Sequence, residues 1–253
     1  MKKTGDYIPY GKHEINDDDI KAINDVLRSD FITQGPKVKE FEKKLSEIVD
    51  VKYTLALSNA TSALHLACLA LGLKGGDLVW TSPNTFVASA NCAKYCDADI
   101  DFVDINLDTG LMDIEKLSNK LKKARIDNRL PKIVIPVHFA GTSCEMESIF
   151  KLSKEYGFSI IEDASHALGG KYHSKAIGSC EFSDFTVFSF HPVKIITTGE
   201  GGVATTNDKT LAQSMRDLRS HGIVKEKERF INEPEGEWYY EQQQLGFNYR
   251  LTD

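Results

Sequence analysis

The sequence lacks a long hydrophobic run and lacks a block of basic residues. Its 253 residues are 41% hydrophobic and 27% charged, with a net charge of -6, which is typical of an ordinary soluble globular protein. Such a sequence predicts no basic surface that would bind nucleic acid and no segment that would span a bilayer. The N-terminal lysines precede no apolar stretch. We therefore expect no signal peptide or membrane anchor and, by default, a cytoplasmic protein.

Cysteine is scarce, and the number and spacing of the cysteines argue against a disulfide framework and against a zinc site. The five cysteines are odd in number and form no CxxC pair, so reduced thiols are predicted. Cys92 and Cys96 could share one helix face and in principle hold a metal ion, but no second ligand pair lies at zinc-site spacing. We interpret them as packing residues and expect no metal site. No GxGxxG follows a predicted strand, which argues against a Rossmann-type nucleotide-binding protein.

Short apolar runs alternate with helical patterns along most of the chain. Strands are predicted at residues 53–57, 77–80, 100–105, 132–139 and 159–163, and helices at 61–71, 86–95, 112–124 and 145–156. Repeated strand-helix units predict an α/β fold whose mostly parallel sheet is covered by helices on both faces. After residue 184, FTVFSF and VATT flank a glycine-rich turn and predict two strands joined without a helix, so that one strand is antiparallel.

Two further helices are predicted before the first strand. Asn16 is the expected cap of a helix over residues 17–28, and another helix follows Gly35-Pro36. The residues expected on their apolar faces are Ile20, Ile23 and Leu27 in the first helix and Val38, Phe41, Leu45 and Ile48 in the second. The segment Glu233-Pro234-Glu235-Gly236 is predicted to be a polar surface loop. We expect one continuous domain over residues 1–253, in which residues 1–35 form an N-terminal arm and helix.

Polar residues that end apolar runs are the first candidates for a site, because parallel α/β sheets bind ligands beyond the carboxyl ends of their strands. The segment 58–62, Ser-Asn-Ala-Thr-Ser, joins a predicted strand to a predicted helix. Free amides at the helix start, the positive end of its dipole and the hydroxyls of Thr61 and Ser62 could hold a phosphate. The alternative is a plain serine or threonine helix cap.

Three more candidates lie near predicted strand ends. Glu162 and Asp163 end the strand at 159–163 and would face the ligand crevice, unless they belong to a surface turn or cap. Lys194 lies among apolar neighbours just before the glycine turn. Burial there would penalise the ammonium form and favour a nucleophile that condenses with carbonyls, although a lysine can also extend past apolar neighbours to solvent. Phe86 could stack on a planar cofactor or belong to the core.

The order of these features resembles that of the fold-type-I pyridoxal phosphate (PLP) enzymes. More specifically, the strings SNATSALHLACLALG, SPNTFVASANC, EDASHALGG, FSFHPVKIITTGEGG and GFNYRLTD resemble the DegT/StrS family of sugar aminotransferases over essentially the whole chain. The resemblance implies the large domain of a fold-type-I PLP-dependent transferase. Relatives continue past the position of Asp253 into a smaller C-terminal domain. We therefore expect that residues 1 to 253 alone are poorly soluble or inactive.

The resemblance assigns roles to residues that match the family motifs. Lys194 would be the lysine that condenses with the cofactor aldehyde, and Asp163 would be the partner of the pyridinium nitrogen. A carboxylate beside that nitrogen keeps its proton in place and makes the ring an electron sink. Thr61, Ser62 and Ser189 would bind the cofactor phosphate.

The remaining assignments concern the ring faces and the neighbouring subunit. Phe86 would lie on one face of the cofactor ring. His166 would either contact the ring or form a structural hydrogen bond, and these two alternatives stay open. Asn248 and Arg250 in GFNYR resemble residues that family members contribute to the site of the adjoining subunit. A homodimer is therefore expected.

The resemblance also implies a reaction. L-glutamate would give its amino group to the C4 ketone of a UDP-linked 4-keto-6-deoxy-N-acetyl hexose, and the 4-amino sugar would serve pseudaminic acid biosynthesis. Some relatives are dehydratases with histidine at the lysine position, but this chain has Lys194. The alternatives are another nucleotide-keto-sugar aminotransferase of the family and a catalytically inactive PLP-binding module.

Overall fold

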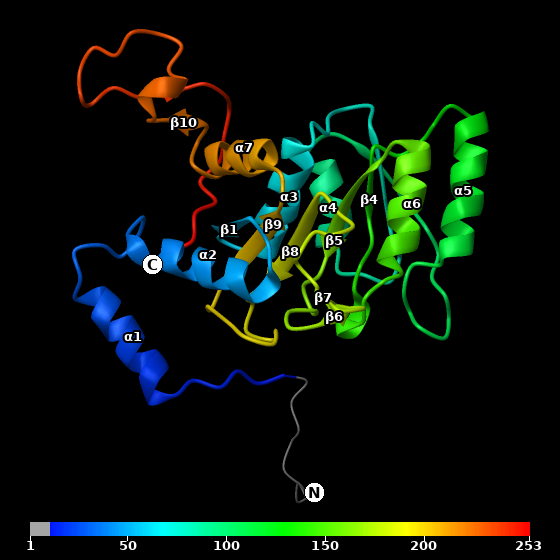
Figure 1. Ribbon diagram of the computed structural model, residues 1–253, viewed down its shortest axis with the longest axis horizontal. Helices are drawn as coiled ribbons and strands as arrows, with labels where there is room; N and C mark the ends of the chain where they lie inside the picture. The colour runs from blue at the N-terminus through cyan, green and yellow to red at the C-terminus, as the bar shows by residue number, and fades with distance from the viewer. Residues whose placement is uncertain (1–10) are drawn as a thin grey trace, which may run out of the picture.

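The computed structural model describes residues 11–253, which form a seven-stranded sheet covered by helices (Figure 1). Residues 1–10, part of the segment for which we predict no signal peptide or anchor, lie outside the described residues. The strand order is β1-β9-β8-β5-β4-β2-β3. The strands are β1 (Tyr53–Leu57), β2 (Leu78–Thr81), β3 (Asp99–Phe102), β4 (Ile133–Ile135), β5 (Ser159–Asp163), β8 (Phe185–Ser189) and β9 (Gly202–Thr206).

One strand of this sheet runs against the others. β9 pairs antiparallel with both β8 and β1, whereas the pairs from β8 across to β3 are parallel. The predicted mostly parallel mixed sheet is confirmed, and the loop 190–201 joins β8 to β9 without a helix, as predicted. Because β9 returns between β8 and β1, its first residue, Gly202, pairs with Ser189 on one side and Leu57 on the other. Gly202 thus lies where both neighbouring strands end.

Helices cover both faces of the sheet, which confirms the prediction. Leu55 and Phe185 belong to the core on one face, beneath α3, α4 and α7, whereas Trp80 and Phe188 lie on the other face, beneath α2, α5 and α6. Alternation of side chains along each strand supplies apolar residues to both layers. The helices are α1 (Asp17–Leu27), α2 (Pro36–Val49), α3 (Ala60–Ala70), α4 (Ala88–Lys94), α5 (Ile114–Ile126), α6 (Met146–Tyr156) and α7 (Lys209–Arg219).

Two charged side chains and the last segment of the chain close the outer edge of β1. The Arg219 guanidinium donates to Glu42 Oε1 and to the Ala56 carbonyl, both at 2.6 Å, and the Ala56 N–H donates to Glu42 Oε1 at 2.8 Å. Beyond the strand end, the Ser58 N–H donates to the Tyr249 carbonyl at 2.9 Å. Edge groups that would otherwise be unpaired are thereby satisfied. The segment around Tyr249 is fixed beside the end of β1.

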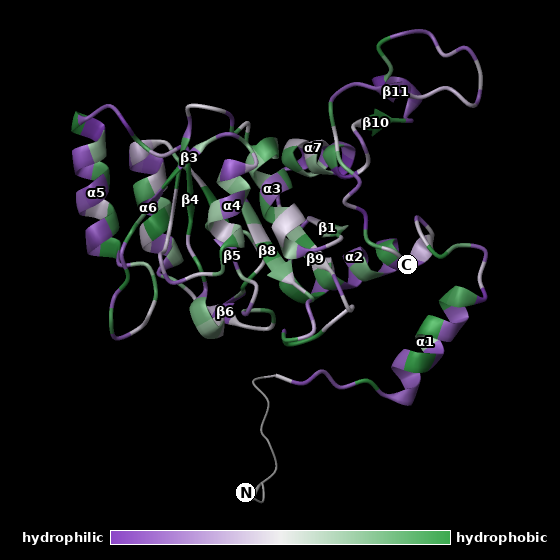
Figure 2. Ribbon diagram, turned by 180° about the vertical axis from the view of Figure 1, so that it is seen from behind, coloured by the Kyte–Doolittle hydropathy of each residue, from purple (hydrophilic) through white to green (hydrophobic). Residues whose placement is uncertain are grey.

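The first helix forms as predicted but stands apart from the sheet (Figures 1 and 2). Asn16 caps it by accepting hydrogen bonds from two amides of the first turn. The predicted apolar face is exposed, with Ile20 at 50%, Ile23 at 56% and Leu27 at 66% of full exposure. Helical periodicity therefore identified the helix correctly, but the apolar face of this helix does not pack against the core of the described residues.

The second helix buries a slightly different face from the predicted one. Leu45 and Val49 are buried, whereas Ile48 is 67% exposed, so the placement of Ile48 on the core face is wrong. Leu45 and Val49 are four residues apart and share a face, while Ile48 is rotated by about 100° from Val49.

The smallest elements were not predicted, because two-residue strands carry no alternation pattern. The segment at 233–236 is exposed, as predicted for a polar surface loop. Within residues 11–253, no helix combines the length and apolar character needed to cross a membrane. The elements that were not predicted are β6 (Lys171–Tyr172), β7 (Lys175–Ala176), β10 (Ile223–Val224), β11 (Glu241–Gln242) and the 3-10 turns Phe139–Gly141 and Lys227–Arg229.

The Asp253 carboxylate caps α2 from the far end of the sequence. It accepts hydrogen bonds from the backbone N–H groups of Gly35 at 2.6 Å, Lys37 at 2.8 Å and Val38 at 3.1 Å. Loss of a helix cap costs about 1 kcal/mol. We expect Asp253→Ala to lower the free energy of unfolding by about this amount in urea denaturation, whereas Asp30→Ala, at an exposed acid, should change it by less than about 0.5 kcal/mol. Equal unfolding curves for both variants would show that solvent replaces this cap.

Candidate active site

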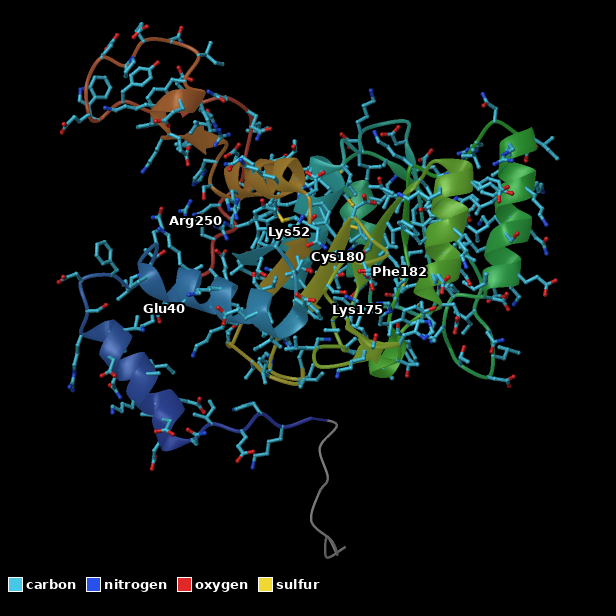
Figure 3. All side chains as sticks on the ribbon, viewed as in Figure 1. Glu40, Lys52, Lys175, Cys180, Phe182 and Arg250 are labelled. Atoms are coloured by element: carbon cyan, nitrogen blue, oxygen red, sulfur yellow. The ribbon has the colours of Figure 1, made fainter. Side chains whose placement is uncertain are left out.

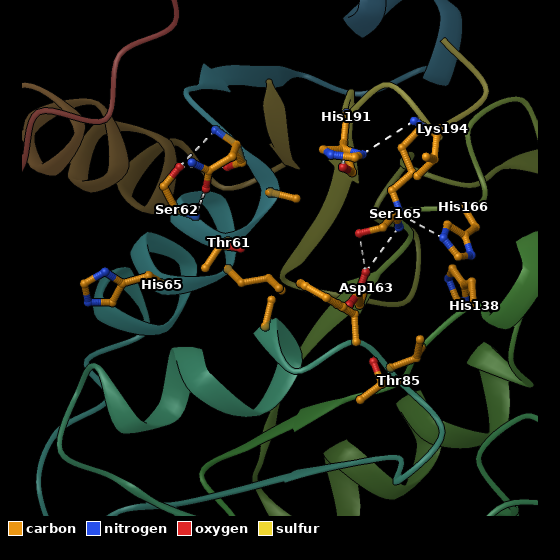
Figure 4. A pocket seen from close by; sticks show the side chains of 18 of the residues that line it. Thr61, Ser62, His65, Thr85, His138, Asp163, Ser165, His166, His191 and Lys194 are labelled. Carbon is orange, nitrogen blue, oxygen red and sulfur yellow. Dashed lines mark hydrogen bonds between the residues drawn. The ribbon is translucent and has the colours of Figure 1, made fainter. Parts of the chain in front are cut away.

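A cavity of about 840 Å³ lies beyond the carboxyl ends of the parallel strands (Figure 4). In Figure 4, Thr61 and Ser62 lie on one side of the cavity, and Asp163, His166 and Lys194 lie on the other. The cavity therefore lies at the end of the sheet where the sequence predicts ligand binding. The cavity wall includes seven residues predicted from the sequence: Thr61, Ser62, Phe86, Asp163, His166, Ser189 and Lys194.

The turn between β1 and α3 presents the start of a helix to this cavity. Asn59 is the cap, because its side chain accepts the Ser62 N–H at 2.8 Å. The Ser62 hydroxyl donates to the Asn59 carbonyl at 2.7 Å and is thus used within the turn. The Thr61 hydroxyl has no hydrogen-bond partner among the described residues, and the first amides of a helix have no acceptor within it. An anion would therefore meet Thr61 and the helix amides more directly than the Ser62 hydroxyl.

Gly202 lets this turn rest directly on the sheet. A Cβ atom at Gly202 would lie 2.2 Å from the Asn59 carbonyl carbon and 2.3 Å from the Ala60 nitrogen, which no side chain could tolerate. The antiparallel course of β9 brings Gly202 beneath the turn. The sequence indicates a glycine turn at 199–202, but the close approach depends on the sheet order, which the sequence does not give.

The Asp163 side chain is buried at the end of β5 and is held by two serines. Ser165 donates to Oδ1 through its hydroxyl at 2.6 Å and its N–H at 3.2 Å, while the Ser89 hydroxyl donates to Oδ2 at 2.6 Å. Asp163 is 5% exposed and lines the cavity. The alternative that this pair of acids belongs to a surface turn is therefore wrong for Asp163.

Glu162 points to the opposite side of the sheet, because successive strand residues alternate. It accepts hydrogen bonds from His138 Nε2 at 2.7 Å and Thr186 Oγ1 at 2.8 Å, and also from the Ser183 hydroxyl. Burial opposes ionisation of Glu162, but these donors outweigh it and lower the pKa of the carboxyl group. Glu162 does not line the cavity, so only Asp163 of the predicted pair faces a ligand there.

The Lys194 side chain extends into the cavity and reaches His166. Nζ of Lys194 lies 2.7 Å from Nε2 of His166. Burial lowers the pKa of Lys194, and burial together with the nearby Lys194 charge lowers the pKa of His166. The sequence suggested that the apolar neighbours of Lys194 would desolvate its amine. Val193 and Ile195 are instead 45% and 61% exposed, so the wall of the cavity, rather than these neighbours, desolvates the lysine.

Phe86 and Ser189 also border the cavity. Phe86 is 75% exposed, so it is not a core residue, and its ring is available to a ligand. Ser189 ends β8, and its hydroxyl lies 3.4 Å from the His191 N–H. Neither position requires a rearrangement of the core for a ligand to reach it.

The structure does not place Asn248 and Arg250 in the wall of this cavity, whereas Tyr249 between them does line it. Backbone pairing of Asn248 with Ser220 and of Arg250 with Leu57 fixes the segment, so alternate residues point in opposite directions. Figure 3 shows Arg250 on this last segment, between α7 and α2. The sequence did not single out Tyr249, although the alternation within GFNYR was a signal that could have identified it.

The matches to known proteins cover nearly the whole chain. The model of the DegT/DnrJ/EryC1/StrS aminotransferase family matches residues 13–253. A Campylobacter jejuni protein named UDP-4-amino-4,6-dideoxy-N-acetyl-beta-L-altrosamine transaminase is 44% identical over 97% of this chain and 61% of its own length. The chain thus spans about three fifths of the length of such relatives.

Solved structures agree with this assignment. Helicobacter pylori PseC, described as an aminotransferase of pseudoaminic acid biosynthesis, is 35% identical, with a TM-score of 0.85 over 96% of this chain and 62% of PseC. Streptococcus pneumoniae Spr1654 in its PLP form is 30% identical, with a TM-score of 0.81 over 97% of this chain and 63% of that protein. The fold is therefore that of the fold-type-I PLP aminotransferases, and the chain belongs to the DegT/DnrJ/EryC1/StrS aminotransferase family.

Proposed function

We propose that the protein is a PLP-dependent aminotransferase. The observation that carries the proposal is the convergence of three groups in one cavity: the Lys194 amine, the Asp163 carboxylate and the start of α3. PLP has three parts that need such partners, namely its aldehyde, its ring nitrogen and its phosphate. A site built only to bind nucleotides would not need a desolvated lysine opposite a buried carboxylate.

The residues of the cavity fit this cofactor part by part. Thr61 and the amides of the α3 start would hold the phosphate, with Ser62 shaping the turn and Ser189 at the end of β8. Asp163 would accept a hydrogen bond from the protonated ring nitrogen, and the exposed Phe86 ring would lie on one face of the cofactor. When bound, PLP supplies an aldehyde and an electron-withdrawing ring that stabilises negative charge at the reacting carbon.

Lys194 has two tasks in the reaction. Its Nζ is the nucleophile toward a carbonyl carbon and, when released, the base that takes a proton from the substrate carbon and returns one. Both tasks need the neutral amine, which the lowered pKa of Lys194 favours. His166 Nε2 can hold Nζ in place between these tasks through the 2.7 Å contact. Asp163, as a hydrogen-bond acceptor, keeps the proton on the ring nitrogen.

We further propose that L-glutamate donates the amino group and leaves as 2-oxoglutarate. The acceptor would be the C4 ketone of a UDP-linked 4-keto-6-deoxy-N-acetyl hexose, which would become a 4-amino sugar for pseudaminic acid biosynthesis. The names of the Campylobacter jejuni and Helicobacter pylori relatives support this substrate.

The test is incubation of the purified full-length protein, rather than residues 1–253 alone, with PLP, L-glutamate and a panel of UDP-keto-sugars. The expected result is 2-oxoglutarate release together with a sugar product whose mass corresponds to replacement of the ketone oxygen by an amino group. Amination of other keto-sugars only would contradict the proposed substrate. A protein that binds PLP but aminates no sugar would be a binding module instead.

We also propose that residues 1–253 form the PLP-binding large domain of a cytoplasmic homodimer. Asn248 and Arg250 would then reach the site of the adjoining subunit, in keeping with their absence from the wall of their own cavity. Sedimentation velocity of the purified protein tests the dimer.

A further inference from the structure

Ser89 makes a buried hydrogen bond to the Asp163 carboxylate that no sequence motif indicated. Ser89 lies in α4, is 0% exposed and donates from its hydroxyl to Asp163 Oδ2 at 2.6 Å. The two residues are 74 positions apart, so the contact exists only because α4 packs beside the end of β5. The Ser89 hydroxyl also lies within hydrogen-bond distance of the hydroxyl of Thr85, a residue of the cavity wall four positions earlier and just before α4.

The direction of these hydrogen bonds follows from the chemistry of the groups. The Thr85 and Ser89 hydroxyl oxygens are 2.7 Å apart, and either could donate on distance alone. An ionised carboxylate only accepts, so the single Ser89 proton goes to Asp163. Thr85 must then donate to Ser89. The result is a directed chain from Thr85 through Ser89 to Asp163, in which each donor fixes the orientation of the next.

The remaining contacts show what Ser89 controls. A carboxylate has about four acceptor positions, and Ser165 takes two on Oδ1. Ser89 takes one of the two on Oδ2, which leaves one acceptor position on the oxygen that Ser89 touches. The direction of that free position is therefore set by the Ser89 hydroxyl.

We infer that Ser89 is a positioning residue that aims the free acceptor position of Asp163 at the cofactor's ring nitrogen, with Thr85 holding the Ser89 hydroxyl in its donating orientation. The inference rests on the proposed function, because the ring nitrogen belongs to PLP. Ser89 touches neither cofactor nor substrate in this arrangement and acts only through Asp163. Removing its hydroxyl leaves Oδ2 without a protein donor, so that only the Ser165 hydrogen bonds to Oδ1 orient the carboxylate and the free acceptor position is less well aimed.

The experiment compares Ser89→Ala, Thr85→Val and the control Ser82→Ala in the full-length protein. Ser82 is 1% exposed and its hydroxyl has no hydrogen-bond partner among the described residues, so the control removes the same atom from a buried site without breaking a hydrogen bond. PLP affinity is measured by titration of the cofactor-free protein, and the pH midpoint of the visible absorption band of bound PLP is measured beside it. Thermal unfolding reports whether each variant is folded.

The expected result is about a tenfold weaker PLP affinity for Ser89→Ala, consistent with the loss of one hydrogen bond to a charged group, and a smaller loss for Thr85→Val. The pH midpoint should move by about half a unit or more in Ser89→Ala, whereas Ser82→Ala should match the wild type in both measurements. Wild-type affinity and an unchanged midpoint in folded Ser89→Ala would overturn the inference alone. Failure of the wild-type protein to bind PLP would overturn the proposed function and this inference with it.

If Ser89→Ala is too poorly folded for titration, Thr85→Val decides the question. Valine has nearly the shape of threonine and lacks only the hydroxyl that orients Ser89. A shifted midpoint in Thr85→Val supports the inference, and an unchanged one overturns it.

Discussion

Replacing Lys194 with alanine should reduce transamination by at least about 1000-fold while leaving the protein folded. A methyl group can neither attack a carbonyl carbon nor carry a proton, and both tasks fall to one amine in the proposed mechanism. The side chain extends into a cavity, so its removal opens no void in the core. The rate of 2-oxoglutarate release measures the loss, and circular dichroism measures the fold.

The matched control is Lys175→Ala, which removes an exposed lysine of the β6–β7 hairpin. Borohydride reduction of the PLP-loaded protein adds an independent measurement, because it fixes the cofactor covalently to its lysine. We expect the added mass on the peptide that contains Lys194 in the wild type and in the control, and nowhere in Lys194→Ala. Turnover by Lys194→Ala at the wild-type rate would contradict the assignment of Lys194 as nucleophile and base.

Replacing Gly202 with alanine should destabilise the protein by about 3 kcal/mol and weaken PLP binding strongly. Overpacking of a core usually costs 1–3 kcal/mol, and here the added methyl group meets backbone atoms of Asn59 and Ala60 at 2.2 to 2.3 Å rather than a flexible side chain. Either the turn or β9 must move. If the turn moves, the amides at the start of α3 no longer face the cavity.

Two measurements separate these consequences. Urea denaturation gives the free energy of unfolding, and titration with PLP gives the affinity. Gly75→Ala is the control, because the added methyl group there would meet no atom closer than 3.7 Å. If Gly202→Ala had both wild-type stability and wild-type affinity, the close contact between β9 and the turn would have no part in the site.

The order of strands and helices could be predicted because each element carries its own periodicity. The runs that became β5 and α6 are readable from a few residues without knowledge of the rest of the chain. The candidate site followed from the rule that ligands lie at the ends of parallel strands, which selected the pair Glu162 and Asp163 and the segment 58–62. The catalytic assignment of Lys194 needed the family resemblance, because one lysine in an apolar setting has several explanations.

What could not be predicted depends on tertiary contacts. The Ser89 hydrogen bond joins residues far apart in sequence, and no local pattern distinguishes it from an ordinary helical serine. The division of Glu162 and Asp163 between the two faces was readable from alternation, but which face carries the cavity was not. The cause of Lys194 desolvation was misjudged for the same reason, since Ile195 beside it is exposed.

The antiparallel course of β9 also determines how Lys194 can move. The loop 190–201 is tied at both ends, by the hydrogen bond from the Phe190 N–H to the Gly201 carbonyl at 2.9 Å and by that from the Thr198 N–H to the Phe190 carbonyl at 3.1 Å. These two bonds close the base of the loop, and the Lys194 N–H also donates to the His191 carbonyl at 2.9 Å, so the side chain can change rotamer without a rearrangement of the loop. Rotamer changes take picoseconds to nanoseconds, whereas loop motions take nanoseconds to microseconds. We expect proton transfer by this lysine to proceed on the faster timescale, without waiting for the loop.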